Sequence, residues 1–258
     1  MDEALSGRYR RFPARPARAD SRPLDIEITF DHADTALPGL SANGDIPEYP
    51  LEIARAGFRL ALKSWYFDGW VDLDRRRGAA SVATRDSAGS VENFLRVAIA
   101  HLLLPEGGFL LHAAAVVCDG GAVICFGPSG AGKTTIASLA GSRPVISDDL
   151  IACRRRDDGA LVVVPTPFRA GGAAPCHDGH EVRAFYRLSQ GGAHSVEAIE
   201  PRRAALEIIG SMPFVHDEPL ASGEALRIAA ETATDPGIER LVFAPDASVW
   251  PFIEGRLR

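Results

Sequence analysis

The sequence contains the stretch Gly127-Pro128-Ser129-Gly130-Ala131-Gly132-Lys133-Thr134, which fits the pattern G-x-x-x-x-G-K-[ST] at every position. Glycines allow a backbone to curl until successive N–H groups point inward at phosphate oxygens, and a helix that begins there adds the positive end of its dipole. In this pattern Lys133 reaches the β and γ phosphates and the Thr134 hydroxyl binds Mg²⁺. We therefore expect residues 127 to 134, with the following Thr135, to bind ATP together with magnesium.

The residues around the loop predict the strand and the helix that this pattern requires. Residues 122–126 form an apolar strand that leads into the loop, and residues 133–141 are compatible with a helix behind it. An earlier apolar run, residues 109–117, is joined to that strand by Asp119-Gly120-Gly121, which is typical of a β-hairpin. The loop is thus expected to follow the second strand of a hairpin.

A pair of acidic residues, Asp148 and Asp149, follows the short strand predicted at residues 145–148. The span from Lys133 to Asp148 holds one short helix and a turn, so this strand is expected to be the next one that a βαβ crossover reaches. In open α/β sheets the carboxyl end of such a strand lies beside the phosphate loop. There, one carboxylate can bind Mg²⁺ or its water and the other can accept a proton from an attacking hydroxyl. The alternative interpretation is a solvated turn.

The rest of the chain divides into three predicted parts. Residues 1–22 are rich in arginine, proline and alanine, which indicates a flexible arm or, as the alternative, a docking arm for an acidic partner. Residues 23–89 carry short alternating runs and predict a small, mostly β module, with a loop at 31–50. Residues 90–258 form the domain that holds the phosphate loop, beginning with a helix that Ser90 caps.

Strands and helices alternate in the later half of that domain. Its segments are predicted from local patterns: strands at 161–164, 185–188, 196–199 and 238–243, a helix that opens with Pro201 near its first position and runs to about 211, and a helix at about 224–232. Arg154-Arg155-Arg156 is expected to form a solvated turn.

Composition narrows the class of protein. The chain has 258 residues, of which 46% are hydrophobic and 24% are charged, and its net charge of −6 gives no general attraction for nucleic acid. No apolar run is long enough to cross a bilayer, and the start of the chain is not expected to be a secretory signal. The four cysteines show no paired spacing, and two of them lie in apolar strand-like runs, so a reducing cytoplasm fits best.

The segment between the strands predicted at 161–164 and 185–188 offers two further candidates. Cys176-His177-Asp178-Gly179-His180 suggests zinc, but its spacing does not match the common finger patterns, and a glycine-rich polar loop is the favoured interpretation. Residues 169–182 are expected to form a mobile loop near the substrate, and Arg169 at its start is a candidate for offsetting charge on a phosphoryl group.

Three stretches together resemble the catalytic domain of HPr kinase/phosphorylase: Leu111-His112-Ala113-Ala114-Ala115-Val116-Val117, the loop from Gly127 to Thr135, and Ile146-Ser147-Asp148-Asp149. The chain looks more like the HPr-kinase-like serine kinases that share only this domain. The resemblance covers roughly residues 90–255. It implies an α/β fold related to ATP-dependent phosphoenolpyruvate carboxykinase, with a mixed sheet, flanking helices and the small β module in front of it.

The resemblance also implies roles for residues. His112 lies where the family has a histidine near the transferred phosphate, Asp148 matches the proposed base, and Asp149 matches the second, metal-associated acid, although these two roles could be exchanged. Thr134-Thr135 is closer to the carboxykinase pattern than to HPr kinase itself. The stretch that HPr kinase uses for its reverse reaction has no convincing counterpart here.

We therefore expect an ATP-dependent kinase that uses Mg²⁺ and transfers the γ-phosphoryl to a hydroxyl, best matched by a serine on a peptide or protein. No nucleic-acid or membrane partner is expected, and the resemblance suggests a homo-oligomer because related kinases oligomerise. Two alternatives stay open: a nucleotide-binding regulatory protein without transfer activity, and a small-molecule phosphotransferase.

Overall fold

The structure is a computed structural model that describes residues 23–31, 51–84, 87–168 and 179–257. The predicted arm at 1–22, most of the predicted loop at 31–50, and Arg169, Cys176 and His177 lie outside the described residues. The chain is mixed α/β and splits into two compact units, residues 1–102 and 103–258. The sequence placed the boundary before Ser90, so the helix at that point falls in the first unit instead of the second.

The first unit contains a five-stranded sheet with the order β1-β5-β4-β3-β2. Its parallel edge pair is β1–β5 and its other pairs are antiparallel; the strands are β1 (Asp25–Asp31), β2 (Glu52–Ala56), β3 (Arg59–Lys63), β4 (Phe67–Asp72) and β5 (Arg77–Ala83). Side chains on β3 alternate between exposed and buried, as the alternating sequence predicted. The mostly β module is therefore present, and β2 is a strand that the sequence analysis did not predict.

A helix, α2 (Ser87–Leu103), packs on this sheet. The Phe94 ring meets the Phe67 ring edge-on at 5.6 Å between centroids, and a Cβ on Gly69 would lie 2.8 Å from Phe94. The absence of a side chain at Gly69 thus leaves the space that the buried Phe94 ring occupies. The predicted cap was wrong, because the helix begins at Ser87 and Ser90 is a buried residue inside its first turn.

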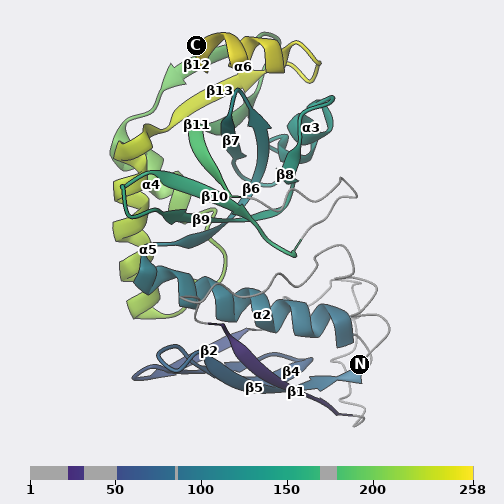
Figure 1. Cartoon of the computed structure of the whole chain (residues 1–258), viewed down its shortest axis with the longest axis vertical. Coiled ribbons are helices and arrows are strands. Elements are labelled where there is room, and N and C mark those ends of the chain that lie inside the picture. Colours follow the sequence, from purple (N-terminus) through teal and green to yellow (C-terminus); the bar gives the residue numbers. More distant parts are fainter. Residues whose placement is uncertain (1–22, 32–50, 85–86, 169–178, 258) are drawn as a thin grey trace, which may run out of the picture. The chain divides into compact units, whose positions relative to one another are not determined.

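The second unit is built on an eight-stranded mixed sheet (Figure 1). Seven strands follow the order β10-β9-β6-β7-β11-β13-β12, and β8 pairs with β6 beside them. The strands are β6 (Phe109–Cys118), β7 (Gly121–Phe126), β8 (Val145–Ser147), β9 (Leu150–Arg155), β10 (Leu161–Pro165), β11 (His180–Gln190), β12 (Ser195–Ala198) and β13 (Glu239–Phe243). Strand β11 reaches back to His180, so residues 180–182 belong to the sheet and not to the predicted loop.

The predicted hairpin is confirmed. Strands β6 and β7 pair in antiparallel register and Cys118 faces Gly121 across the turn. Both turn residues have positive φ, 46° at Asp119 and 79° at Gly120, which is the type I′ geometry that suits the twist of a hairpin. Two cysteines of this hairpin are buried, Cys118 on β6 and Cys125 on β7. Burial raises the pKa of the Cys118 thiol to about 11, and the charges of Glu254 and Asp119 add to that shift.

The connection from the loop to the paired aspartates differs from the predicted one. A helix, α3 (Lys133–Ser138), follows the loop, ends earlier than expected and leads to β8. Strand β8 does not pair with β7, because β6 lies between them and is antiparallel to both. Strands β7 and β8 are therefore parallel to each other across β6, and their carboxyl ends still lie at the same edge of the sheet.

Helices complete the second unit. They are α4 (Pro201–Ile209), α5 (Pro219–Thr232) and α6 (Val249–Leu257), with a short 3₁₀ turn η2 (Leu104–Glu106) and a π turn η3 (Ala233–Gly237). One face of the sheet is buried under α3 and α6, where the Trp250 indole nitrogen donates to the carbonyl of Ile136 at 3.1 Å. Helices α4 and α5 pack against each other. Within the described ranges, no helix has the length and apolar character that a membrane crossing requires.

One prediction of local structure in this unit was wrong, and one helix was not predicted. Arg154 and Arg155 do not form a solvated turn with Arg156, because both lie on β9 and pair with β10. Helix α6 was not predicted from the sequence. Its third residue is Pro251, which a helix tolerates in the first turn, where no backbone donor is lost.

Candidate functional site

The loop at residues 127–132 is curled as the glycine pattern predicts. Its three glycines have positive φ, 153° at Gly127, 77° at Gly130 and 105° at Gly132, a region that other residues rarely adopt. The N–H of Ala131 donates to the carbonyl of Pro128 at 3.1 Å, which closes the curl. Residues 128–130 are exposed, whereas Gly127 at the end of β7 is buried. The loop therefore presents its tip to solvent from a fixed base.

Two residues from neighbouring strands hold this loop. The side-chain amide of Gln190 at the end of β11 donates to the carbonyl of Gly130 at 2.6 Å. The ring of Phe243 at the end of β13 packs against Gly132 so closely that an added Cβ would lie 2.6 Å from its Cζ. Strands β7, β11 and β13 are parallel, so their carboxyl ends meet at this edge. The sequence analysis did not single out Gln190, and its position before Gly191-Gly192 at a strand end is the signal that could have found it.

Lys133 lies beneath the loop with its ammonium group turned toward the backbone. It is 7% exposed, and its Nζ donates to the carbonyls of Gly127 at 2.8 Å and Pro128 at 3.1 Å. Burial lowers the pKa of Lys133, and the negative charge of Asp149 opposes that shift. Thr134 and Thr135, in the first turn of α3, are exposed.

The structure brings Asp149 and His112 together. The Nε2 atom of His112 lies 3.3 Å from Oδ1 of Asp149, and both side chains are partly exposed. Their backbones are also fixed, since the carbonyl of Asp149 accepts the N–H of Ala113 at 2.9 Å and Ala113 pairs with Phe126 across β6–β7. The base of the loop and the acidic pair therefore lie on either side of Ala113. Asp148, also partly exposed, is the residue before Asp149.

The residues present suit a magnesium ion bound together with a nucleotide. Among the described residues no group of three or more His, Cys, Asp or Glu side chains forms a metal cage. Magnesium ordinarily keeps several waters and takes only one or two protein oxygens besides substrate phosphates. The Thr134 hydroxyl and the Asp149 carboxylate are oxygen donors of that kind, so they are the residues that would hold it.

A pocket of about 360 Å³ adjoins the loop. Its lining comes from Pro128, from α4 and from the residues that follow α4: Arg203, Leu206, Glu207, Gly210 and Ser211. The carbonyl of Ser211 accepts the N–H of His112 at 2.9 Å. The pocket thus borders the strand that carries His112. The sequence analysis predicted the helix but not this pocket, because a helix whose end adjoins a loop distant in sequence leaves no local signal.

A Ser–His–Asp group lies on the segments that follow β11 and β13, but its hydrogen bonds do not suit a nucleophile. His194 Nδ1 accepts the N–H of Ala244 at 3.3 Å, so Nε2 carries the ring proton and donates to Ser248 Oγ at 2.8 Å. The Ser248 hydroxyl donates to Asp246, and this bond together with the one from the Ser248 amide lowers the pKa of Asp246. With no acceptor nitrogen facing the serine, the group braces the segment after β13.

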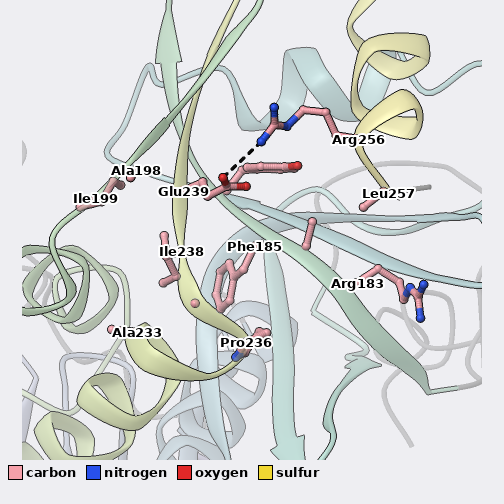
Figure 2. A pocket seen from close by; sticks show the side chains of 13 residues that line it. Arg183, Phe185, Ala198, Ile199, Ala233, Pro236, Ile238, Glu239, Arg256 and Leu257 are labelled. Carbon is pink, nitrogen blue, oxygen red and sulfur yellow. Dashed lines mark hydrogen bonds and ion pairs between the residues drawn. The ribbon is translucent and has the colours of Figure 1, made fainter.

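Another pocket, of about 330 Å³, lies toward the amino ends of β11 and β13, away from the loop (Figure 2). Phe185, Pro236 and Ile238 line it, and Arg256 pairs with Glu239 at 3.3 Å on its border. None of the predicted site residues lines this pocket.

Comparisons with known proteins add little to this geometry. No protein-family model and no curated protein matches the sequence. Among solved structures, the HPr(Ser) kinase/phosphatase from Coxiella burnetii is similar over 57% of this chain and 91% of that chain, with 15% sequence identity and a TM-score of 0.30. A likeness of this size assigns no role to any residue and does not define the family.

Proposed function

We propose that this chain is an ATP-dependent phosphotransferase of the HPr-kinase-like kind, which transfers the γ-phosphoryl group to a hydroxyl, best matched by a serine on a peptide or protein. The observation that carries the proposal is the convergence of Lys133, Asp149 and His112 at one sheet edge, with Lys133 beneath the curled loop. Phosphoryl transfer needs positioning and charge stabilisation, and this group supplies an ammonium, a carboxylate and an imidazole.

The loop and Lys133 have the first task, which is to hold the triphosphate. In the structure Nζ of Lys133 contacts two loop carbonyls, and these contacts keep the ammonium beneath the loop before nucleotide arrives. On binding, the ammonium group would exchange part of these contacts for β and γ phosphate oxygens. Thr134 and Asp149 would hold Mg²⁺, which offsets charge on the phosphates when it is bound.

Asp148 and His112 have the remaining tasks. Asp148 would accept the proton of the attacking hydroxyl, which is the role that the resemblance to HPr kinase implies for it, while Asp149 contacts His112. His112 would bind a phosphate oxygen through its partly exposed ring, held in place by Asp149. The acceptor oxygen then forms a bond to the γ-phosphorus while the bond to the β–γ bridging oxygen breaks, and ADP leaves.

The test is phosphate transfer from γ-labelled ATP to serine peptides, with binding of Mg-ATP measured separately by calorimetry. We expect transfer by the native chain, loss of transfer with retained ATP binding in Asp148→Asn, and loss of both in Lys133→Met. Binding without transfer to peptides or to metabolites would favour a regulatory protein, whereas transfer confined to metabolites would favour a small-molecule phosphotransferase. Absence of Mg-ATP binding by the folded protein would overturn the proposal.

A further inference from the structure

The pocket beside the loop has the position that a substrate-recognition site requires. Pro128, the second residue of the loop, forms one wall, and Ser211 at the other side holds the backbone of His112 through its carbonyl at 2.9 Å. A chain segment lying in this pocket would therefore be close to both the loop and the strand that carries His112. We infer that the pocket receives the residues that flank the acceptor serine, one apolar and one acidic; this inference rests on the proposed function.

The apolar preference follows from Leu206. Its side chain is 64% exposed although it lines a concave surface. An exposed leucine alone is ordinary on a protein surface. Leu206 differs from an ordinary exposed leucine because it lines a pocket that borders the loop. Its neighbours Ala205 and Ile208 are buried and hold the helix in position. An apolar side chain in the pocket would cover Leu206 and remove its surface from water.

The acidic preference follows from Arg203, which lines the pocket and whose partner carboxylate, Glu207, is shared with a second arginine. The Glu207 carboxylate is shared between two arginines, Arg187 at 3.2 Å and Arg203 at 3.9 Å. The Arg203 side chain is 63% exposed and lies at the longer distance, so it keeps donors for a further carboxylate. Because Arg203 and Leu206 are three residues apart on one helix, their side chains are neighbours, and one short peptide can contact both.

A peptide library with a fixed serine and one varied flanking position at a time tests this inference. With γ-labelled ATP, we expect the native chain to prefer leucine or a similar apolar residue at one flanking position and aspartate or glutamate at another. Leu206→Ala should reduce the preference for leucine over alanine about tenfold. Arg203→Ala should reduce the preference for aspartate over asparagine about twofold to fivefold, because the pair is exposed, and Arg203→Glu should favour lysine instead.

Two control variants match these changes closely. Leu220 is 65% exposed, about as much as Leu206, and Arg202 is an exposed arginine on the helix that carries Arg203. Neither residue lines the pocket. Leu220→Ala and Arg202→Ala should leave both preferences unchanged. The pocket variants should keep the native Kd for Mg-ATP, which excludes a general loss of folding.

The outcomes separate this inference from the proposed function. Transfer without any preference, or preferences that the controls change as much as the pocket variants do, overturns the inference and leaves the kinase proposal standing. Absence of transfer to every member of the library overturns both.

Discussion

Substituting alanine for Gly132 should destabilise the second unit by an amount that the structure allows us to work out. Gly132 has a φ of 105°, and holding alanine in such a conformation costs about 1–3 kcal/mol. The added Cβ would lie 2.6 Å from Cζ of Phe243, a ring that is 2% exposed and closely packed. Overpacking of this kind costs about a further 1–3 kcal/mol. The less flexible unfolded chain returns about 0.4–1 kcal/mol, so we expect a net loss of about 1–6 kcal/mol.

Gly130→Ala is the matched control for that change. Gly130 also has a positive φ, 77°, but a Cβ there would meet nothing within 4 Å. Only the cost of the backbone conformation remains, so we expect a net loss of about 1 kcal/mol. The two variants should therefore differ by the contribution of the Phe243 ring together with the difference in backbone cost between a φ of 105° and one of 77°.

Tryptophan fluorescence during urea unfolding can measure this difference in the second unit alone. Trp250 is buried there and bonds to the helix that follows the loop, whereas Trp65 and Trp70 belong to the first unit. In a Trp65→Phe/Trp70→Phe background only Trp250 reports, and the midpoints with their slopes give the free energies of unfolding. Phe243→Leu should recover part of the loss in Gly132→Ala. Equal losses in the two glycine variants would refute the reasoning that Phe243 fixes the loop.

Three further perturbations test other contacts. Gln190→Ala removes the hydrogen bond to Gly130, so the Kd for Mg-ATP should rise about twofold to tenfold by calorimetry; an unchanged Kd would mean that the bond does not position the loop. Because folding lowers the pKa of Lys133, the unfolded chain binds more protons than the folded chain between the folded and unfolded pKa, and the free energy of unfolding should rise with pH in that window. Asp149→Asn should extend this rise to lower pH, and Lys133→Met should abolish it in the native chain and in the Asp149→Asn variant, as measured by urea midpoints. Glu218 and Glu200 each accept two backbone N–H groups at the start of a helix. Glu218→Ala should cost about 1–3 kcal/mol because that side chain is buried, whereas Glu200→Ala, at an exposed position, should cost about 0.5–1 kcal/mol. A larger loss of thermal stability in Glu200→Ala than in Glu218→Ala would contradict this ranking.

The features that the sequence predicted well are those whose signals are local. Positive φ at Gly130 and at Gly120 follows from the glycine pattern and from the Asp119-Gly120 turn, because few other residues adopt these conformations. The start of α4 is similar, since Pro201 at its first position needs no partner for the missing N–H. Such signals depend on neighbours in the chain and not on tertiary contacts.

The features that the sequence did not predict depend on contacts between distant segments. Strand β9 follows the paired aspartates directly and ends in arginines, so its sequence resembles a solvated turn; pairing with β6 and β10 decides its conformation. The bond from Gln190 to Gly130 joins residues that only the parallel pairing of β7 and β11 brings together. The roles of Asp148, Asp149 and His112 stay predictions, although the structure places the last two in contact.

The strand between β7 and β8 has a consequence for recognising distant relatives of this chain. Ala113 on β6 lies opposite Phe126 on one side and bonds to Asp149 on the other, so backbone hydrogen bonds set the separation between the loop and the acids. The connecting segment, residues 133–144, does not set it. A relative whose helix there is one turn longer or shorter would keep the same geometry, and a search that requires a fixed interval between the lysine and the aspartates would overlook it.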